Sequence, residues 1–358
     1  MSKLERIVIK GFKSIKEVDL ELSNINILIG SNGAGKSNFI SFFRLLNNMI
    51  ENNLETYVTK SGGANTLFHY GVKNTSEIFA DLYFGQNRYK VSFESTDNDQ
   101  LFFAEESAMY LTSIDTWYSS FNRFGKQETG LLTQNPKAVT RYVRESLENW
   151  VVYHFHDTSS TADVKKTCNI DDNFELRHNA SNLAAYLYYL KQKHNENYVN
   201  IIKTIQIVAP YFEDFILRPS LLNEGKIKIE WKEVGSDQYL DANSFSDGTL
   251  RFICLATVLM QPSLPETIII DEPELGLHPY ALNILASLIK QASVNSQIII
   301  STQSVPLINQ FTVNDIITVD RDESSSVFNR CNDFELQSWL EDYTLGELWE
   351  KNLLGGRP

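Results

Sequence analysis

The feature that most constrains this chain is a glycine-rich octapeptide, GSNGAGKS at Gly30–Ser37, set between two apolar segments. The apolar run Ile25–Ile29 before it predicts a buried strand. After it, apolar residues recur at helical spacing: Phe39, Ile40, Phe43 and Leu46. A strand, a glycine loop and a helix in this order bind phosphate, because backbone N–H groups curl around the anion and the helix N-terminus adds its positive dipole end. The chain is therefore expected to bind a nucleotide at this loop.

The octapeptide matches GxxxxGK[ST], a pattern that gives its last two residues separate tasks. Lys36 is expected to reach the β- and γ-phosphates, and the Ser37 hydroxyl is expected to bind Mg²⁺. The other positions are expected to surround the phosphates: Gly30, Ser31, Asn32, Gly33, Ala34 and Gly35. The guanine-reading motif NKxD is absent from the sequence, so ATP is favoured over GTP.

A second motif, TIIIDEP at Thr267–Pro273, begins with an apolar run and ends in two carboxylates. In a parallel sheet such a strand would deliver Asp271 and Glu272 to the carboxyl edge, beside the loop Gly30–Ser37. Asp271 is expected to bind Mg²⁺ through water, and Glu272 to orient or deprotonate the attacking water. The motif alone also fits a strand that ends in a solvated acidic turn, but its pairing with the upstream loop favours the magnesium site.

A third motif, SFSDGT at Ser244–Thr249, stands directly before a segment that predicts a buried helix, Thr249–Met260. Small polar residues at a helix start can bind an anion, here through Ser246, Asp247 and Gly248. Because the chain already has one phosphate loop, a second such helix start suggests a composite site. In that site it would cap the γ-phosphate held by another copy of the chain. Simple N-capping by Ser246 or Asp247 is the alternative.

The order of the predicted elements indicates an α/β fold. Strands are predicted at Leu4–Ile9, residues 18–22, Ile78–Phe84, Arg88–Phe93 and Lys226–Lys232, and the third and fourth of these are expected to form a hairpin closed around Gly85, Gln86 and Asn87. The first four of these indicate an antiparallel β subdomain near the N-terminus. Fully apolar strands at Thr267–Ile270 and Gln297–Ile300, separated by a helix, indicate a mostly parallel sheet that is covered on both faces.

These patterns divide the chain into three regions. Residues 1–111 are expected to form an N-terminal ATPase lobe with the phosphate loop. Residues 112–220 are predicted to be a mainly helical insertion, since apolar residues recur at helical spacing near 139–150 and 183–190. Residues 221–358 are expected to form a C-terminal ATPase lobe that carries the other motifs.

With these motifs in order, the sequence resembles the ABC-type ATPases of the RecF/SMC/OLD group. More narrowly, it resembles the stand-alone AAA15-like (AAA_21) ATPases of bacterial anti-phage defence operons. The resemblance covers nearly the whole chain, and it also rests on GFKSI at Gly11–Ile15, IIIDEPELGLHP at Ile268–Pro279, IIISTQS at Ile298–Ser304 and GELWEKNLLGGRP at Gly346–Pro358. It implies an ABC ATPase head, a P-loop NTPase whose mostly parallel sheet is joined to an antiparallel N-terminal β subdomain and a helical insertion.

The resemblance also implies roles for single residues. Glu272 would be the catalytic base, and Glu274–His278 would meet the partner in a homodimer formed through ATP and the SFSDGT motif. Gln303 would sense the γ-phosphate, where many ABC ATPases have His; glutamine can orient a water but does not gain a charge near neutral pH. Lys13 in GFKSI either touches nucleotide phosphate or is a solvated edge charge. The implied cofactors are ATP and Mg²⁺.

Composition narrows the functional classes. The chain has 32 basic and 45 acidic residues, a net charge of −13, so any contact with DNA is expected to be local. The longest apolar stretch, Phe252–Met260, is far shorter than the roughly 20 residues of a membrane span, and early charges interrupt any signal peptide. The 3 cysteines lack CxxC spacing, which argues against a zinc ribbon or a disulfide framework. We therefore expect a cytoplasmic protein without a membrane partner.

Three further features are interpreted as structural rather than functional. His154 and His156 would share one face of a strand, but no further ligands of clear spacing follow, so a hydrogen-bonding turn is favoured over a metal site. Neighbouring tyrosines at helical spacing are expected in the core rather than stacked on bases: Tyr186, Tyr188 and Tyr189. A modest basic stripe is expected to be a solvated helix face: Lys137, Arg141 and Arg144.

The function expected from the resemblance is that of an ATPase that senses or regulates within an anti-phage defence or toxin–antitoxin complex. The residues after Gln303 lack the glutamate and DxD pattern of a Toprim site, so a separate effector protein in the same operon, a nuclease in this interpretation, would do the cutting. The alternative is a RecF/SMC-like DNA-binding ATPase in DNA repair or maintenance. A transporter subunit fits poorly, because the GFKSI opening and the GGRP ending point elsewhere.

Overall fold

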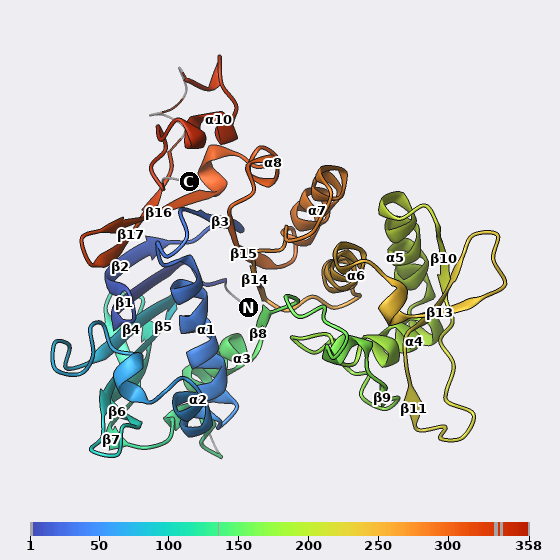
Figure 1. Ribbon diagram of the computed structural model, residues 1–358. Coiled ribbons are helices and arrows are strands. Elements are labelled where there is room, and N and C mark those ends of the chain that lie inside the picture. Colours follow the sequence, from blue (N-terminus) through green and yellow to red (C-terminus); the bar gives the residue numbers. More distant parts are fainter. Residues whose placement is uncertain (1–2, 135, 333–335, 337–338, 357–358) are drawn as a thin grey trace.

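The computed structural model describes residues 3–134, 136–332, 336 and 339–356. Figure 1 shows that the described chain forms two halves that meet near the middle of the molecule. One half, on the left, holds two large sheets and the helices that cover them. The other half, on the right, holds two helices and two small sheets.

The sheet that carries the predicted motifs has six strands, of which five run parallel. The strand at one edge pairs antiparallel with its neighbour. In spatial order the strands are β17 (Ser325–Arg330), β16 (Ile316–Asp322), β3 (Ile25–Ile29), β15 (Gln297–Thr302), β14 (Thr267–Asp271) and β8 (Trp150–Tyr153).

Cover on both faces explains why the central strands are apolar at most positions. In β14, Ile268 and Ile270 belong to one buried cluster, whereas Ile269 belongs to the other. The same alternation is found in β15. Successive side chains of a strand point to opposite faces, so a strand covered twice needs an apolar residue at every position. The predicted mostly parallel sheet is thereby confirmed.

A second six-stranded sheet is antiparallel and lies against α1 (Lys36–Ile50). Phe39, Phe42 and Phe43 of α1 share a buried cluster with the inner face of this sheet. The predicted antiparallel N-terminal subdomain and its hairpin are confirmed. In spatial order the strands are β2 (Ile15–Glu21), β1 (Arg6–Phe12), β4 (Ile78–Phe84), β5 (Asn87–Ser95), β6 (Leu101–Leu111) and β7 (Trp117–Lys126).

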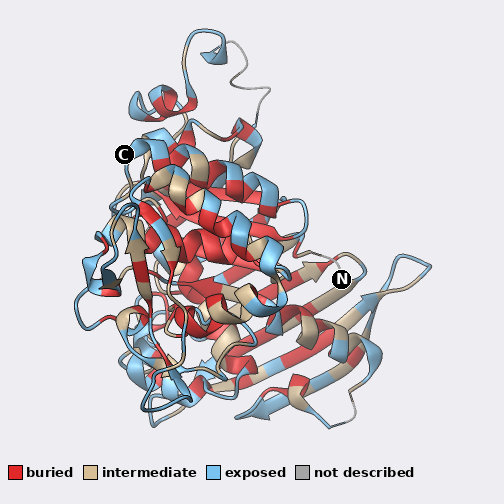
Figure 2. Ribbon diagram, turned by 90° about the vertical axis from the view of Figure 1, so that its right-hand side faces the viewer, coloured by how far each residue is buried: buried red, intermediate tan, exposed pale blue. Residues whose placement is uncertain are grey.

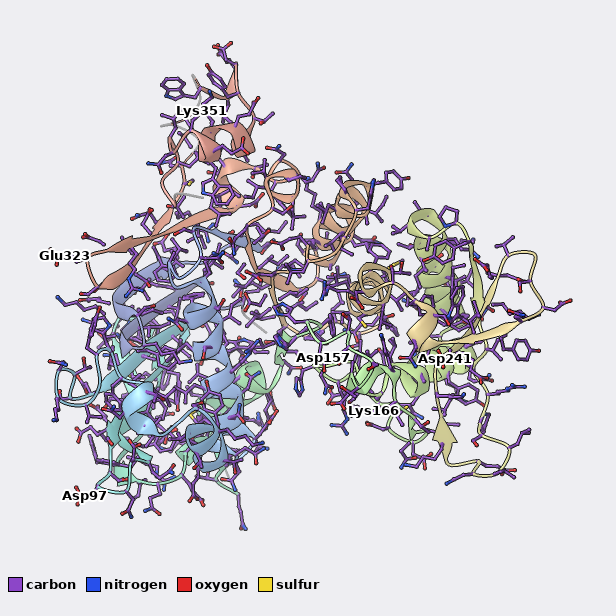
Figure 3. All side chains as sticks on the ribbon, viewed as in Figure 1. Asp97, Asp157, Lys166, Asp241, Glu323 and Lys351 are labelled. Carbon is purple, nitrogen blue, oxygen red and sulfur yellow. The ribbon has the colours of Figure 1, made fainter. Side chains whose placement is uncertain are left out.

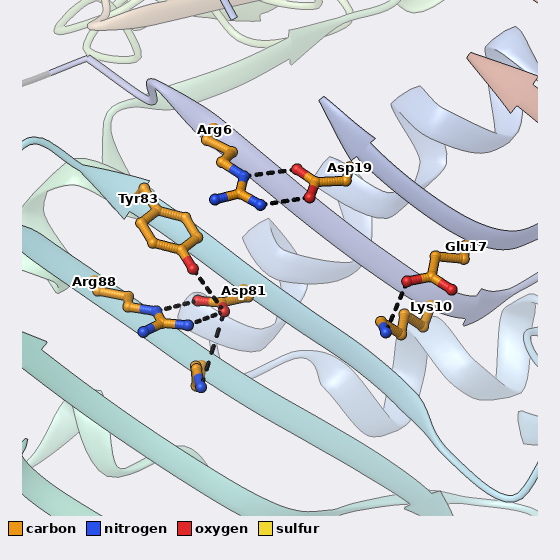
Figure 4. A network of polar contacts seen from close by, with 8 residues as sticks. Arg6, Lys10, Glu17, Asp19, Asp81, Tyr83 and Arg88 are labelled. Carbon is orange, nitrogen blue, oxygen red and sulfur yellow. Dashed lines mark hydrogen bonds and ion pairs between the residues drawn. The ribbon is translucent and has the colours of Figure 1, made fainter. Parts of the chain in front are cut away.

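The outer face of the antiparallel sheet carries ion pairs between neighbouring strands (Figure 4). Arg6 Nε of β1 donates to Asp19 Oδ1 of β2 at 2.6 Å, and this hydrogen bond lowers the pKa of Asp19. Arg88 Nε of β5 donates to Asp81 Oδ1 of β4 at 2.7 Å. Opposite charges across neighbouring strands favour the observed pairing. They also mark this face as the one directed to solvent.

Helices cover the parallel sheet and one face of the antiparallel sheet, with exposed residues along their outer sides (Figure 2). The α6 helix is buried along most of its length, as its apolar sequence predicts. None of the helices in the described part of the chain is long and apolar enough to cross a membrane. Besides α1, the described helices outside residues 183–208 are α2 (Leu54–Lys60), α3 (Ala138–Glu148), α6 (Asp247–Leu259), α7 (Pro279–Ala292), α8 (Val305–Ile308) and α10 (Leu345–Glu350).

The other half of the molecule is built on α4 (Leu183–Lys193) and α5 (Asn195–Val208), and the segment around Asp157 leads into it (Figure 3). Trp231 stacks on Phe245, with ring centroids 4.4 Å apart and planes inclined by 14°. This contact joins the small sheets to the start of α6. The small sheets comprise β10 (Phe212–Phe215), β12 (Glu230–Glu233) and β13 (Tyr239–Asp241), and the pair β9 (Cys168–Asn169) and β11 (Lys226–Ile227).

The secondary structure differs from the predictions in two places. The first part of the region 112–220 is not mainly helical, because it contains β7, which extends the antiparallel sheet, and β8, which is the edge strand of the parallel sheet. Both strands form through partners distant in sequence, which local periodicity does not report. The single strand predicted at Lys226–Lys232 is divided into β11 and β12, which pair with different strands. The division of the chain into three domains stays a prediction.

The C-terminal segment returns to the parallel sheet. Trp349 of α10 is buried, and the Gly356 N–H donates to Asp320 Oδ2 of β16 at 2.7 Å. The last two residues of the motif at Gly346–Pro358 lie outside the described residues. The described part of that motif therefore packs against the same sheet as the nucleotide motifs.

One buried carboxylate joins three parts of the N-terminal lobe. Glu106 of β6 is fully buried and accepts hydrogen bonds from Tyr89 Oη at 2.7 Å and the Gly130 N–H at 2.6 Å. The Thr129 hydroxyl donates to it as well. A buried charge of this kind is tolerated only when donors surround it.

Replacing Tyr89 by Phe is expected to lower the free energy of unfolding by about 1.5–3 kcal/mol, because a buried charged acceptor loses one donor. Urea denaturation followed by circular dichroism measures the change. Tyr118→Phe is the control: its ring is 57% exposed on β7, and a change of less than about 0.5 kcal/mol is expected. Equal stability of Tyr89→Phe and the unmodified protein would contradict a structural role for this hydrogen bond.

Candidate functional site

The loop Gly30–Ser37 connects the end of β3 to the start of α1. Gly33 and Gly35 have φ angles of 79° and 122°, in the left-handed region that favours glycine. A Cβ atom on Gly35 would also collide with the Ser326 hydroxyl of β17. The loop therefore needs glycine both for its backbone conformation and for its close approach to the neighbouring strand.

The Lys36 ammonium lies across this loop. The residue is only 4% exposed, and its Nζ donates to the carbonyl oxygens of Gly30 at 2.7 Å and Ser31 at 3.0 Å. Burial lowers the pKa of Lys36, while the carboxylates of Glu272 and Asp271 act in the opposite direction. A cation held between the loop and two carboxylates is suited to the phosphates of a nucleotide bound with a metal ion.

Asp271 ends β14 opposite the first turn of α1. The distance from its Oδ1 to Ser37 Oγ is 3.5 Å, and the Ser301 hydroxyl of β15 donates to the same carboxylate oxygen. Serine and carboxylate oxygens are hard ligands of the kind that Mg²⁺ prefers, with water completing its coordination. Ser37 and Asp271, the two residues predicted to hold Mg²⁺, thus lie close together, and their oxygen atoms are suitable ligands for this ion.

Glu272 follows directly and has a positive φ of 45°. This conformation is uncommon outside glycine, and it turns the carboxylate away from the strand toward the loop. Glu272 Oε1 accepts a hydrogen bond from Gln303 Nε2 at 2.9 Å, and the same nitrogen donates to Asn32 Oδ1 at 2.7 Å. Gln303 therefore bridges the phosphate loop and the second carboxylate, two motifs that lie about 240 residues apart in the chain.

These side chains border an open hollow of about 360 Å³, lined by Asn32, Glu272, Glu274, Leu275, Gln303 and Ser304. Glu274 Oε1 accepts the backbone N–H of Gln303 at 2.8 Å, and burial raises the pKa of Glu274. Its Oε2 is buried without a hydrogen-bond partner among the described residues. Two carboxylates, those of Glu272 and Glu274, thus line this hollow.

Ser246 caps α6 in the way predicted for simple N-capping. Its Oγ accepts the Thr249 N–H at 3.1 Å, and Ser246 and Asp247 are exposed. Gly248 packs so closely on the Gly276 carbonyl that a Cβ atom would collide with it. No hydrogen bond in the described residues joins Ser246–Gly248 to the phosphate loop of the same chain. Its predicted contact with a nucleotide stays a prediction.

A buried arginine inside α6 links the motifs, and the sequence analysis missed it. Arg251 Nε donates to the Phe155 carbonyl at 3.0 Å and Nη2 to the His156 carbonyl at 3.2 Å, while Nη1 donates to the Leu275 carbonyl. His156 Nε2 in turn lies 2.8 Å from the Asp271 carbonyl oxygen, which only accepts, so the imidazole N–H is the donor. A charge in an otherwise apolar helix was the available sequence signal for Arg251.

Lys13 lies in the turn between β1 and β2, and its side chain reaches α1 one turn beyond Ser37. Its Nζ donates to Ser41 Oγ at 2.7 Å, and desolvation together with Arg44 lowers the pKa of Lys13. No hydrogen bond joins it to the phosphate loop within the described residues. Its two interpretations, phosphate contact or solvated edge charge, therefore stay predictions.

The structure agrees in part with the structural roles expected for the tyrosines and the basic stripe. Tyr186 is buried in α4, but Tyr188 and Tyr189 are only partly buried. Arg144 pairs with Glu148 on its own helix at 2.7 Å, as expected for a solvated face. The described residues contain no group of three or more His, Cys, Asp and Glu side chains that could hold a metal ion.

Arg251→Met is expected to lower the free energy of unfolding by about 2–4 kcal/mol, since three backbone carbonyls lose a charged donor while the apolar stem is retained. Chemical denaturation measures this effect. The control is Arg144→Met, whose partner is exposed on the helix surface; its effect is expected to stay below about 1 kcal/mol. If Arg251→Met were as stable as Arg144→Met, the three hydrogen bonds of Arg251 would make no measurable contribution to the free energy of unfolding.

Solved structures with this fold include two heads of SMC proteins. The SMC head bound to the C-winged helix domain of ScpA has a TM-score of 0.56 and 16% identity over 94% of this chain and 99% of that one. The Smc head domain with an extended coiled coil, bound to the C-terminal domain of ScpA from Pyrococcus furiosus, has a TM-score of 0.53 and 16% identity over 96% and 99%. At this identity the likeness shows the fold, that of an ABC-type ATPase head.

The family follows from the sequence comparison. No curated protein matches the chain. The family model AAA_21, described as "AAA domain, putative AbiEii toxin, Type IV TA system", matches residues 25–309. This range includes the phosphate loop, the SFSDGT motif, the acidic pair and Gln303. The chain therefore belongs to the AAA_21 family of ATPase domains.

Proposed function

We propose that the protein binds and hydrolyses ATP at the loop Gly30–Ser37 and works as a nucleotide-dependent dimer. The observation that carries this proposal is the bridging amide of Gln303, which donates both to Asn32 of the loop and to Glu272. A terminal phosphate and its attacking water need a place within reach of the loop and of a base. The amide nitrogen of Gln303 marks such a place.

In this proposal the side chains divide the work. The backbone N–H groups of the loop and Lys36 hold the phosphates. Ser37 and Asp271 hold Mg²⁺, which when bound neutralises charge on the phosphate oxygens. Glu272 accepts a proton from the attacking water, and Gln303 keeps this water in line with the γ-phosphate by exchanging its hydrogen bond to Asn32 for one to the water.

The placement of the SFSDGT motif supports the proposed dimer. Its exposed helix start makes no hydrogen bond to its own phosphate loop among the described residues, yet it has the backbone N–H groups and the dipole that bind anions. A second copy could place Ser246–Gly248 over the γ-phosphate of the first. Two such contacts would hold the dimer closed until ATP is hydrolysed.

Glu272→Gln is expected to retain ATP binding, to lower kcat by about 100-fold or more through loss of the base, and to accumulate an ATP-bound dimer. Turnover assays and sedimentation velocity measure these effects. Lys36→Ala is the contrasting variant, because it should lose nucleotide affinity and dimerisation together. Near-normal turnover by Glu272→Gln would remove Glu272 from the role of base.

For the biological role we propose a sensor or regulator in an anti-phage defence or toxin–antitoxin complex that controls a separate effector, a nuclease. The description of the family, which names a putative toxin and a type IV toxin–antitoxin system, supports this role. The net charge of −13 also argues against broad contact with nucleic acid and favours a protein partner.

The second candidate is a DNA-binding ATPase of repair or maintenance, like RecF or SMC proteins. The likeness of the fold to SMC heads favours it. In this case the dimer itself would be the working unit, and local contact with the DNA backbone would supply affinity. The two candidates differ in what the ATP-bound dimer holds.

Affinity isolation of the ATP-loaded Glu272→Gln protein from its host, before and after nuclease treatment, tests the two candidates. A stoichiometric protein encoded nearby that survives the nuclease is expected for the regulator. The purified protein should then bind duplex DNA weakly. Partners lost on nuclease treatment, together with tight DNA binding that weakens steeply with salt, would instead support the DNA-binding ATPase.

A further inference from the structure

Three hydroxyl groups form a row at the start of α6. Tyr211 Oη lies 3.0 Å from Thr249 Oγ1, and Thr249 Oγ1 lies 2.8 Å from Ser246 Oγ. The Thr249 N–H also donates to Ser246 Oγ at 3.1 Å. Tyr211 comes from the connection between α5 and β10, 38 positions before Thr249, so the row joins two separate segments.

The hydrogen-bonding capacity of Ser246 limits how this row can be arranged. A serine hydroxyl donates one hydrogen bond and accepts two. When Thr249 donates through both its N–H and its hydroxyl, both acceptor positions of Ser246 are filled. The proton of Ser246 is then free to point outward. In the opposite arrangement Ser246 donates to Thr249, and its proton is used within its own chain.

Tyr211 decides between the two arrangements. A phenol is more acidic than an aliphatic alcohol, so it is the stronger donor and the weaker acceptor of the two. With Tyr211 at its end, the row is most stable when Tyr211 donates to Thr249 and Thr249 donates to Ser246. The free proton is then that of Ser246, at the exposed helix start.

Packing holds the tyrosine in this position. The Tyr211 carbonyl accepts the Val234 N–H at 2.8 Å, and its ring lies 5.9 Å from that of Trp231. Trp231 stacks on Phe245, the residue directly before Ser246. Although Tyr211 is 39% exposed, its ring and the start of α6 thus pack against the same aromatic cluster.

We propose that Tyr211 is a positioning residue that acts through Thr249 to present the Ser246 hydroxyl as a hydrogen-bond donor to the γ-phosphate of ATP on a second copy of the chain. The proposal rests on the ATP-bound dimer of the proposed function. No covalent bond changes: the row only selects the direction of three hydroxyl protons. A phosphate oxygen accepts hydrogen bonds and cannot donate, so a committed donor strengthens the contact.

The test measures dimerisation and nucleotide binding separately in the Glu272→Gln background. Tyr211→Phe keeps the ring and removes the hydroxyl. The expected result is an ATP affinity of the monomer that is unchanged, and a dimer dissociation constant raised about five-fold for each of the two contacts, as the loss of about one neutral hydrogen bond predicts. A fluorescent ATP analogue gives the ATP affinity, and sedimentation with saturating ATP gives the dimer dissociation constant.

Two variants of Thr249 test the row independently. Thr249→Val removes the relaying hydroxyl and is expected to weaken the dimer at least as much as Tyr211→Phe, with little further effect when the two are combined. Thr249→Ser retains the hydroxyl and is expected to retain the dimer. If Tyr211 affected the dimer by a route other than Thr249, the effects of Tyr211→Phe and Thr249→Val would add.

The matched control is Tyr239→Phe on β13, whose ring is 52% exposed and whose hydroxyl has no hydrogen bond among the described residues. It should leave the dimer unchanged. Equal dimer affinity of Tyr211→Phe and Tyr239→Phe would overturn the role of Tyr211 while leaving the ATP-bound dimer intact. Failure of the Glu272→Gln parent itself to dimerise with ATP would overturn the dimer, and the role of Tyr211 with it.

Discussion

Backbone pairing among β3, β15 and β14 is the constraint on which the candidate site depends. Ile29 pairs with Thr302, and Ser301 pairs with Asp271. The chain leaves the sheet after each of these positions at the same carboxyl edge, so the phosphate loop, Gln303 and Glu272 emerge side by side. Parallel strands give this result generally, because all of their carboxyl ends meet at one edge. A slip of one strand by a single residue would separate the bridging amide from its two partners.

Hydrophobic burial does not by itself set this register, since the strands are apolar at almost every position and a slipped strand would still be buried. Buried amides supply the missing specificity. Gln297 is 1% exposed and donates to the carbonyls of Leu4 and Ser23, and Asn26 is fully buried and donates to the carbonyls of Ser23 and Ile298. A slip would leave these polar groups buried without partners, which is costly. The apolar sheet therefore drives burial, and a few polar groups determine alignment.

The two halves of the molecule share one buried apolar cluster, to which α4, α5, α6 and β14 all contribute, and hydrogen bonds to backbone carbonyls add to this packing. Arg251 ties α6 to the segment after β8 and to the loop after β14, and His156 ties that segment to Asp271. A shift of α6 would therefore also displace Asp271, the carboxylate proposed to hold the metal. The hydroxyl row of Tyr211 and Thr249 extends the same connection to the exposed end of α6.

The sequence by itself determined the phosphate loop, the acidic pair after β14 and the helix start at Ser246, because each depends on residues close together in the chain. It also indicated the parallel sheet, since strands covered on both faces must be apolar. Only the tertiary structure decided that β7 and β8 are strands and that Arg251, His156 and Tyr211 contact the motifs. Their partners are backbone carbonyls and hydroxyls that lie 24 to 115 positions away. Such contacts leave no periodic pattern, because they depend on where folding places distant segments rather than on local preference.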